Sequence, residues 1–356
     1  MLRLRSLVIA RLTNFFAARD FIQVHPPIIT SSDCEGAGEV FMVSPAAPIP
    51  SNGEMIQSQY DEFFFNSPKY LTVSSQLHLE ALAQSVGKVW CLSPAFRAEK
   101  SDTPRHLSEF YMLEAEAVFV EELGSIMDIV EDMIRDVAIG LQHSRVGTEL
   151  LAARDNDDAA EENSAVTRAV LSHRWRRLGD GPWPRVSYQE AIQHLKDAET
   201  QNRVQFNFTA DYSAGLQTEH ERFLADSIGQ GGPVFVTDYP RKLKPFYMAP
   251  SAETNTGAAT DTTVACFDLL VPETCELVGG SMREHRLPEL LKSMEANGLK
   301  AGSNGTLDWY VDLRKYGSVP HGGFGMGFDR LLCYLSGVPN IRDVVSFPRW
   351  HRRCDC

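Results

Sequence analysis

The sequence predicts an α+β protein built on an antiparallel β-sheet that is flanked by helices. Two observations carry this expectation: residues 264–271 and 276–281 have the pattern of buried strands, whereas residues 123–141 repeat apolar side chains at helical spacing. Strands and helices alternate along the chain with long excursions between them, and no repeat period is visible. This order is typical of a mixed α+β architecture.

Composition limits the class of protein. The 356 residues, 43% of them hydrophobic, suffice for one large core or two small domains. The sequence contains no run of about 18 apolar residues, so it predicts no membrane span. The net charge is −13 and there is no dense Lys/Arg block, which counts against broad nucleic-acid binding. The seven cysteines form no paired CxxC pattern, which indicates a reduced intracellular compartment. We therefore expect a cytoplasmic protein.

The first residues allow two interpretations. Arg3, Arg5 and Arg11, with no acid before Asp20, are typical of an organellar transit peptide, which would place the protein in the mitochondrial matrix. The apolar residues of this stretch, however, share one helical face: Leu4, Leu7, Val8, Leu12 and Phe15. The stripe favours a structural amphipathic helix.

Further elements follow in order. Residues 21–29 have the pattern of an extended strand that Pro26 and Pro27 restrict to a sheet edge or an interface. Serine caps predict helices that open at 74–75 and at 187. Apolar spacing predicts another helix at 218–228, and strands are expected at 70–73 and 233–239. Composition predicts loops at 31–41, 44–60 and 249–262.

The stretch 143–185 differs from its surroundings. Residues 150–165 are acidic and poor in apolar side chains, so they cannot bury enough surface to order themselves. A more helical patch follows at 171–178. We expect a flexible insertion here, partly acidic and partly helical.

Residues 96–119 form a predicted hairpin with the first candidate site. Strand alternation puts polar side chains on one face of the first run, and the loop adds more: Arg97, Glu99, Lys100, Arg105 and His106. One face of the second run carries Phe110, Met112, Glu114 and Glu116. Arginine pairs with phosphate and an aromatic ring can stack on a base, so the hairpin suits a nucleoside polyphosphate. A salt-bridged surface hairpin would show the same pattern.

Residues 321–338 supply a second candidate site. The glycines at 322, 323, 325 and 327 allow close backbone approach, and the helix that follows carries Arg330 in its first turn. A helix N-terminus and a guanidinium together favour an anion.

These segments resemble the three signature motifs of class II aminoacyl-tRNA synthetases. The N-terminal helix, strand and prolines resemble motif 1, FRAE and RHLSEF resemble motif 2, and HGGFGMGFDR resembles motif 3. The remaining matches are closest to asparaginyl-tRNA synthetases of organellar and bacterial type: FVTDYP, KPFYM, ELVGGSMRE, LRKYGSVPHGGFGMGF and IRDVVSFPR. The resemblance implies the class II fold, with an antiparallel sheet flanked by helices, and a homodimer that buries the N-terminal helix and the Pro26–Pro27 strand.

The resemblance implies ATP as a substrate. Arg97 would hold the α-phosphate, and Arg330 would lie over the adenine or meet the γ-phosphate; these two are the expected catalytic residues. Phe110 would stack under the adenine, and Glu99 and His106 would hold the adenine and the terminal phosphates. The full expected ATP-binding set is Arg97, Glu99, Arg105, His106, Phe110, Glu276 and Arg330.

The resemblance also implies a magnesium site at Asp268 and Glu276, because hard cations take oxygen ligands and Mg²⁺ is usually shared with substrate phosphates. The alternative is that both acids pair with nearby arginines. Strand alternation puts both carboxylates on partly apolar faces, where an unpartnered carboxylate would be costly. This favours the metal site.

For the amino acid, the resemblance implies a carboxamide pocket. Glu114 would accept the side-chain amide N–H, Arg283 would donate to the amide oxygen, and Gln76 and Glu35 would orient the α-amino group. Leu79 stands where aspartyl relatives carry a lysine. One acid and one base suit an amide, which has one donor group and one acceptor, whereas a carboxylate would meet Glu114 with like charge.

The expected function is therefore ATP-dependent activation of L-asparagine to asparaginyl-AMP and transfer of the asparaginyl group to tRNA(Asn). The resemblance begins at motif 1, so we expect 1–356 to be a single catalytic domain without the family's N-terminal anticodon-binding OB domain. The alternative is a tRNA-independent ligase that passes an aminoacyl adenylate to ammonia or a small amine. A third hypothesis is a non-catalytic regulatory paralogue. The intact motif residues argue against it. One departure is Asp329, where the family usually has glutamate.

Overall fold

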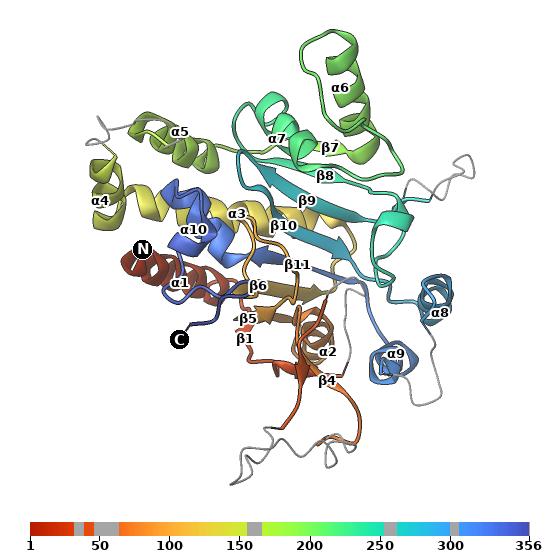
Figure 1. Cartoon of the computed structure of the whole chain (residues 1–356). Helices are drawn as coiled ribbons and strands as arrows, with labels where there is room; N and C mark the ends of the chain where they lie inside the picture. Colours follow the sequence, from red (N-terminus) through yellow and green to blue (C-terminus); the bar gives the residue numbers. More distant parts are fainter. Residues whose placement is uncertain (32–38, 46–63, 155–165, 253–261, 300–305, 356) are drawn as a thin grey trace.

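The computed structural model describes residues 1–31, 39–45, 64–154, 166–252, 262–299 and 306–355 (Figure 1). Glu35 lies outside the described residues, as do most of the predicted loops 31–41, 44–60 and 249–262. The centre of the molecule is an eight-stranded sheet with the order β1-β5-β6-β11-β10-β9-β8-β7. Its interior pairings are antiparallel, whereas β1–β5 and β7–β8 at the two edges are parallel. The predicted antiparallel sheet is confirmed.

The bounds of the eight strands are β1 (Ile22–Gln23), β5 (Lys88–Phe96), β6 (Glu109–Val118), β7 (Arg185–Ser187), β8 (Val234–Thr237), β9 (Cys266–Val271), β10 (Cys275–Met282) and β11 (His321–Gly327). A small second sheet consists of β2 (Ile29–Thr30), β4 (Lys69–Leu71) and β3 (Met42–Val43).

The helices of the described chain are α1 (Leu2–Ala17), α2 (Gln76–Val86), α3 (Leu123–Gln142), α4 (Arg145–Ala153), α5 (Arg168–Gly179), α6 (Tyr188–Thr200), α7 (Thr218–Ser227), α8 (Leu287–Ala296), α9 (Asp308–Lys315) and α10 (Phe328–Ser336). None of the described helices is long and apolar enough to cross a membrane. The predicted cap of α6 is confirmed, because Ser187 and Glu190 form a capping box.

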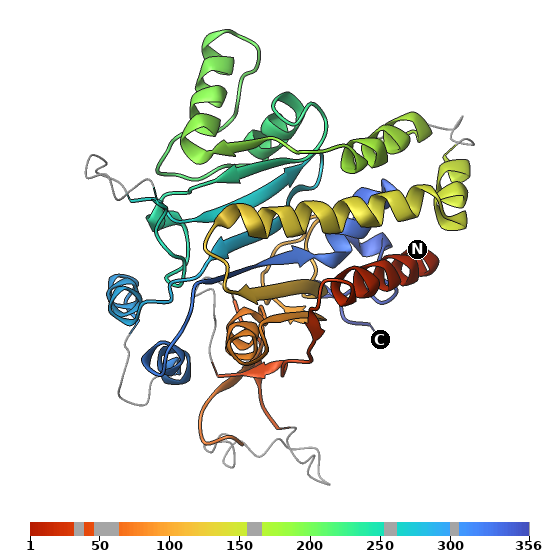
Figure 2. The ribbon, with the colours of Figure 1, turned by 180° about the vertical axis from the view of Figure 1, so that it is seen from behind.

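Helix α3 lies across one face of the sheet with α1 beside it (Figure 2). Alternate residues of β6, such as Leu113 and Ala115, belong to the same buried cluster as Ile134 of α3. The opposite face of β6 is thereby left to form a site. The predicted N-terminal helix is confirmed, and its stripe from Leu4 to Phe15 is already buried within this chain. We expected a second copy to cover that stripe, but α3 contributes to the core that covers it.

The helical part of the stretch 143–185 is built into the core. Leu171, Trp175 and Leu178 of α5 are buried in the main cluster. The indole Nε1 of Trp175 donates to the carbonyl of Leu335 at 2.8 Å, which ties α5 to α10. Residues 150–153 belong to α4, and residues 155–165 lie outside the described residues, so the expected flexibility of this part stays a prediction.

Two predicted strands differ from the structure. The first hairpin strand was expected to include Arg97 and Glu99, but β5 ends at Phe96, because the amide of Ala98 donates to the carbonyl of Glu39 at 2.7 Å instead of continuing the β-ladder. The expected strand at 21–29 is reduced to β1 and the start of β2, with the prolines between them. The edge position of β1 is as predicted.

Candidate functional site

A row of residues across four strands forms the floor of a cleft. Glu114 of β6 lies opposite Gly325, Gly325 lies opposite Gly279, and Gly279 lies opposite Asp268 of β9. The two glycines leave the sheet bare between the two carboxylates. A Cβ at Gly325 would lie 3.0 Å from the Cε of Met112, so these positions keep the space open.

Two cavities of about 450 and about 240 Å³ open on this face of the sheet. They share Arg97, Met112, Glu276 and Gly325, so they form one continuous cleft. The smaller cavity is lined by the entire expected ATP-binding set: Arg97, Glu99, Arg105, His106, Phe110, Glu276 and Arg330. The larger one is lined by the remaining described candidates: Gln76, Glu114, Asp268 and Arg283.

The smaller cavity has guanidinium groups from both halves of the chain. Arg97, just after β5, lies 5.8 Å from the ring centroid of Phe110 and 3.7 Å from the Glu99 carboxylate. Arg330, in the first turn of α10, donates through Nη1 to the carbonyl of Glu276 at 3.0 Å. The positive charge and the aromatic face lie where a nucleotide needs phosphate contacts and a stacking surface.

His106 extends this wall. Its Nε2 lies 3.6 Å from Glu99, and its Nδ1 lies 2.5 Å from the hydroxyl of Thr103. Burial lowers the pKa of His106, and the positive charges of Arg330, Arg105 and Arg97 act in the same direction while Glu99 opposes them. The imidazole is therefore neutral at neutral pH, and it can hydrogen-bond without adding charge.

In the larger cavity, Glu114 is held at the start of α2. Its Oε1 accepts from the Ser74 hydroxyl at 2.5 Å, and its Oε2 accepts from the amide of Ser75 at 2.9 Å. Burial raises the pKa of Glu114, although both hydrogen bonds and the charge of Arg283 oppose that shift. The expected caps therefore act differently from the prediction. Ser75 is the N-cap residue, but its hydroxyl pairs with the Ser93 hydroxyl at 3.1 Å and does not cap the helix, whereas the Ser74 hydroxyl orients a site carboxylate.

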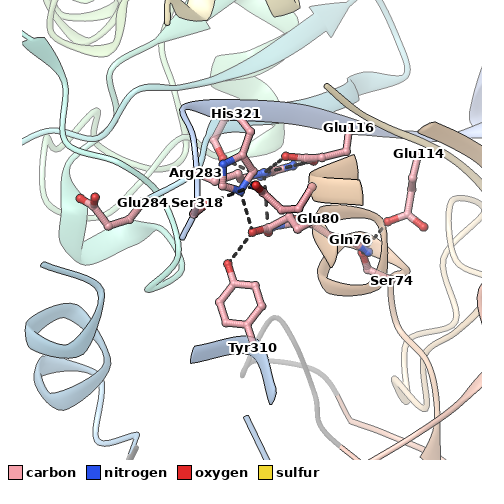
Figure 3. Close-up of polar contacts among 12 residues, drawn as sticks. Ser74, Gln76, Glu80, Glu114, Glu116, Arg283, Glu284, Tyr310, Ser318 and His321 are labelled. Atoms are coloured by element: carbon pink, nitrogen blue, oxygen red, sulfur yellow. Dashed lines mark hydrogen bonds and ion pairs between the residues drawn. The ribbon is translucent and has the colours of Figure 1, made fainter. Parts of the chain in front are cut away.

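Arg283 is buried and already paired. It donates through Nη2 and Nε to the Glu116 carboxylate at 3.0–3.3 Å, and through Nη1 to the Ser281 hydroxyl at 2.6 Å (Figure 3). Strand alternation puts Glu116 on the same face as Glu114, but sequence reasoning gave it no role. That position on a shared face was the signal that could have found it.

Glu80 of α2 lies behind this pair and is fully buried. It accepts from Arg314 Nη2 at 2.6 Å, from the Tyr310 hydroxyl at 2.7 Å and from Gln76 Nε2 at 3.1 Å (Figure 3). Nothing local in the sequence marks these partners as a group, because α2 and α9 meet only in the fold. Sequence reasoning missed all of them except Gln76.

The two candidate metal ligands approach each other over Gly279. A Cβ at that glycine would lie 3.2 Å from the Glu276 Oε1 and 3.6 Å from the Asp268 Oδ1. Lys244 donates to both oxygens of Asp268 at 2.7 and 2.9 Å, a pairing that was not predicted. In the described chain no cationic side chain lies within ion-pair distance of the Glu276 carboxylate. Two carboxylates above a bare glycine fit a divalent cation shared with phosphate oxygens.

The negative charge of Asp268 and Glu276 also affects the pKa of a third carboxyl group, that of Glu221. Burial raises the pKa of Glu221 to about 7, with Glu276 and Asp268 acting in the same direction. The described residues nevertheless contain no group of three such side chains placed to hold a metal ion. Any ion here would have to complete its coordination with substrate oxygens.

Asp329, the departure in the glycine-rich motif, has structural partners. Its carboxylate accepts from the amide of Tyr111 at 2.9 Å and from the guanidinium of Arg5. It is buried and joins α10 to β6 and α1. The shorter side chain therefore anchors the helix that carries Arg330.

Comparisons with known proteins agree with this geometry. The family model for tRNA synthetases of class II (D, K and N) matches residues 1–351. The mitochondrial asparagine–tRNA ligase of Saccharomyces cerevisiae is 44% identical over 353 residues, which cover 98% of this chain and 68% of that protein. The asparagine–tRNA ligase of Geobacter metallireducens is 40% identical over 356 residues, covering 99% of this chain and 71% of that protein.

Solved structures give the same result. The asparaginyl-tRNA synthetase of Pyrococcus horikoshii, complexed with asparaginyl-adenylate, superposes with a TM-score of 0.77 at 29% identity and covers 99% of this chain and 68% of that one. The Entamoeba histolytica asparaginyl-tRNA synthetase, also with asparaginyl-adenylate, has a TM-score of 0.76 at 29% identity and covers 100% of this chain and 68% of that one.

Proposed function

The chain belongs to the class II tRNA synthetases (D, K and N), and we propose that it activates L-asparagine with ATP and transfers the asparaginyl group to tRNA. The observation that carries this proposal is the continuous cleft. One end has the arginines and the aromatic ring that suit ATP, and the other has a buried acid and a buried base that suit a carboxamide. Relatives that are 40–44% identical are asparagine–tRNA ligases, which supports the same assignment.

Asparagine fits the larger cavity by chemistry. Glu114 keeps acceptor capacity for an amide N–H, since each carboxylate oxygen has a further lone pair. Arg283 is the donor for the amide oxygen, and Gln76 lies at the same cavity for the α-amino group. Leu79, also in the lining, adds no cation that a substrate carboxylate could use. The assignment of Glu35 to the ammonium group remains a proposal from the resemblance.

The first step is in-line attack of the asparagine α-carboxylate on the α-phosphorus of ATP. A new oxygen–phosphorus bond forms, the bond to the bridging oxygen breaks, and pyrophosphate leaves with that electron pair. Because little proton transfer is needed, the rate comes from positioning and from charge neutralisation. In this proposal Arg97 meets the α-phosphate, and Arg330, with Arg105, His106 and Glu99 nearby, binds the remainder of the nucleotide above Phe110.

Magnesium is the cofactor that we propose, held by Asp268 and Glu276. A bound Mg²⁺ would supply positive charge to the phosphate oxygens in the cleft. Lys244, paired with Asp268, would keep that carboxylate oriented and ionised. Glu276 is the better ligand of the two, since no cationic side chain of the described residues pairs with it.

The second step is attack by the terminal ribose hydroxyl of tRNA on the carbonyl carbon of the adenylate. The ester bond forms, the bond between the carbonyl carbon and the phosphate oxygen breaks, AMP leaves with that electron pair, and the hydroxyl proton passes to water. The competing acceptor, ammonia or a small amine, would give an amide instead, and the net charge of −13 is the observation that favours it. Incubation with ATP and labelled asparagine, with and without tRNA, separates the two. We expect acid-precipitable asparaginyl-tRNA and no amide by mass spectrometry, whereas tRNA-independent amide formation would overturn the proposal.

We also propose a homodimer and a location in the cytoplasm or the mitochondrial matrix. The exposed apolar side chains of Ile22, Ile28 and Ile29 flank the two prolines and offer a surface for a second copy. The similarity to a mitochondrial ligase of yeast supports the matrix. Light scattering and a fluorescent fusion test these two statements; a monomer, or a signal in neither compartment, would contradict them.

A further inference from the structure

Behind the amino-acid end of the cleft lies a closed set of four charged side chains. Glu80, Glu116, Arg283 and Arg314 have exposed fractions of 0, 1, 3 and 5%. Arg283 contacts Glu116 at 3.0 Å and lies 3.9 Å from Glu80, and Arg314 contacts Glu80 at 2.6 Å. Two carboxylates thus oppose two guanidinium groups. Arg283 and Glu116 line the amino-acid cavity, whereas Glu80 and Arg314 lie behind it. Figure 3 shows Glu80 of α2, Glu116 of β6 and Arg283, just after β10, converging, and Arg314 belongs to α9.

His321 adds further contacts to this set. Its Nδ1 lies 2.7 Å from the carbonyl of Val319, and its Nε2 lies 3.2 Å from the Glu80 Oε2 and 3.4 Å from the Arg314 Nη2. Around the amide-binding position, Glu114 adds a third carboxylate to the two carboxylates and two guanidinium groups of the set.

The fold makes room for this arrangement. A Cβ at Gly323 would lie 2.0 Å from the Glu116 Oε2 and 2.2 Å from the carbonyl of Ala115. The glycine is therefore needed for the Glu116 carboxylate to lie under Arg283. Leaving either charge without its partner in such a buried place would be strongly destabilising.

We propose that Glu80 and Glu116 determine substrate specificity by cancelling the charge of Arg283, so that it donates to an amide oxygen without attracting a carboxylate. This inference rests on the proposed function. An uncompensated guanidinium would hold aspartate, because a unit charge about 8 Å away changes the affinity for a carboxylate about 30-fold at an effective dielectric constant of about 20. Both acids are positioning residues, since they act through Arg283.

The two acids differ in one respect. Glu80 also accepts from Gln76, which lines the cavity at the α-amino end, whereas Glu116 contacts Arg283 and not Gln76. Glu80→Gln should therefore raise KM for every amino acid and also relax the choice of side chain. Glu116→Gln should relax the choice of side chain alone.

The experiment is ATP–pyrophosphate exchange with asparagine and with aspartate, for wild type, Glu80→Gln, Glu116→Gln and the double variant Glu80→Gln/Arg314→Gln. We expect the ratio of kcat/KM for asparagine to that for aspartate to fall at least tenfold in each single variant, with kcat/KM for aspartate rising. The double variant removes one charge of each sign and should keep a ratio within about threefold of wild type.

Glu284→Gln is the matched control. Its carboxylate is also buried and adjacent in sequence to Arg283, but it pairs with Arg286 at 2.8 Å and points away from the amino-acid pocket (Figure 3). Its ratio should equal that of wild type. Circular dichroism and thermal melts show which variants fold. The result is decided by those of Glu80→Gln, Glu116→Gln and the double variant that are folded.

An unchanged ratio in the folded single variants, with both substrates losing activity equally, would overturn the inference and assign the acids a purely structural role. So would a double variant as unselective as the single ones. Failure of the proposed function itself would appear separately, as absence of asparagine-dependent exchange in wild type.

Discussion

Arg97 and Arg330 line one cavity of about 240 Å³, although one follows β5 and the other belongs to α10 near the end of the chain. The sheet brings them together, because β6 pairs with both β5 and β11, and β11 leads directly into α10. An anion in this cavity meets guanidinium groups from two elements that are far apart in sequence.

Replacement of either arginine by lysine keeps the charge but removes the planar fork that matches phosphate geometry. We expect Arg97→Lys and Arg330→Lys to lower kcat/KM for ATP in pyrophosphate exchange by about 100-fold or more. Arg145→Lys is the control, since Arg145 is exposed and pairs with Glu149 on the surface. Losses smaller than threefold in both site variants would contradict the phosphate assignment.

The choice of asparagine over aspartate should depend on pH through Glu114. Its pKa is raised by burial, so its carboxyl group takes up a proton as the pH falls toward that pKa. The neutral acid can donate to the carboxylate of aspartate, and repulsion disappears. The ratio of kcat/KM for asparagine to that for aspartate should therefore fall as the pH is lowered, and it should begin to fall at a higher pH than an ordinary carboxyl group would cause.

Ser74→Ala provides the companion measurement. The Ser74 hydroxyl donates to Glu114 and lowers its pKa, so the loss of that bond should move the fall in selectivity to higher pH. A ratio that stays constant as the pH is lowered in both proteins would show that Glu114 does not titrate in contact with the substrate.

Magnesium dependence should be set mainly by Glu276. Removal of divalent cations with EDTA should abolish exchange, and added Mg²⁺ should restore it. Glu276→Gln should raise the Mg²⁺ concentration for half-maximal rate about tenfold or more. Glu273→Gln is a control on the same β-hairpin, because Glu273 pairs with Arg174 outside the cleft. Equal Mg²⁺ requirements in wild type and Glu276→Gln would remove Glu276 from the metal site.

Helix α5 should contribute to global stability. Leu171 is fully buried against the main core, so Leu171→Ala should lower the free energy of unfolding by about 2–5 kcal/mol in urea titrations. Val170→Ala, at a side chain that is 45% exposed, should change it by less than about 1 kcal/mol. If both substitutions lowered the free energy of unfolding by less than about 1 kcal/mol, α5 would not contribute to global stability.

The parts of the fold with regular apolar spacing were predictable. The stripes of α1 and α3 and the buried runs of β9 and β10 agree with the structure. The extent of β5 was predicted wrongly. The predicted hairpin begins at Phe96, whereas β5 ends at that residue. The helices α8 and α9 have only 10 and 8 residues, too few turns for a clear apolar stripe, and their burial depends on partners distant in the sequence.

The candidate site divides in the same way. Residues recognised through motifs, such as Arg97, Glu114 and Arg283, lie along one cleft. Their supporting partners could not be read from spacing. Lys244 reaches Asp268, and Arg314 reaches Glu80, only because separate elements meet around the sheet. A charged residue on a short helix has the same sequence pattern whether it faces solvent or a buried acid.

The most direct test of the whole account is the initial rate of ATP–pyrophosphate exchange with each amino acid offered singly. Exchange that requires ATP and asparagine, with kcat/KM at least about a thousandfold above that for aspartate, is the predicted result. Exchange that aspartate supports as well as asparagine does, or no exchange with either, would contradict it.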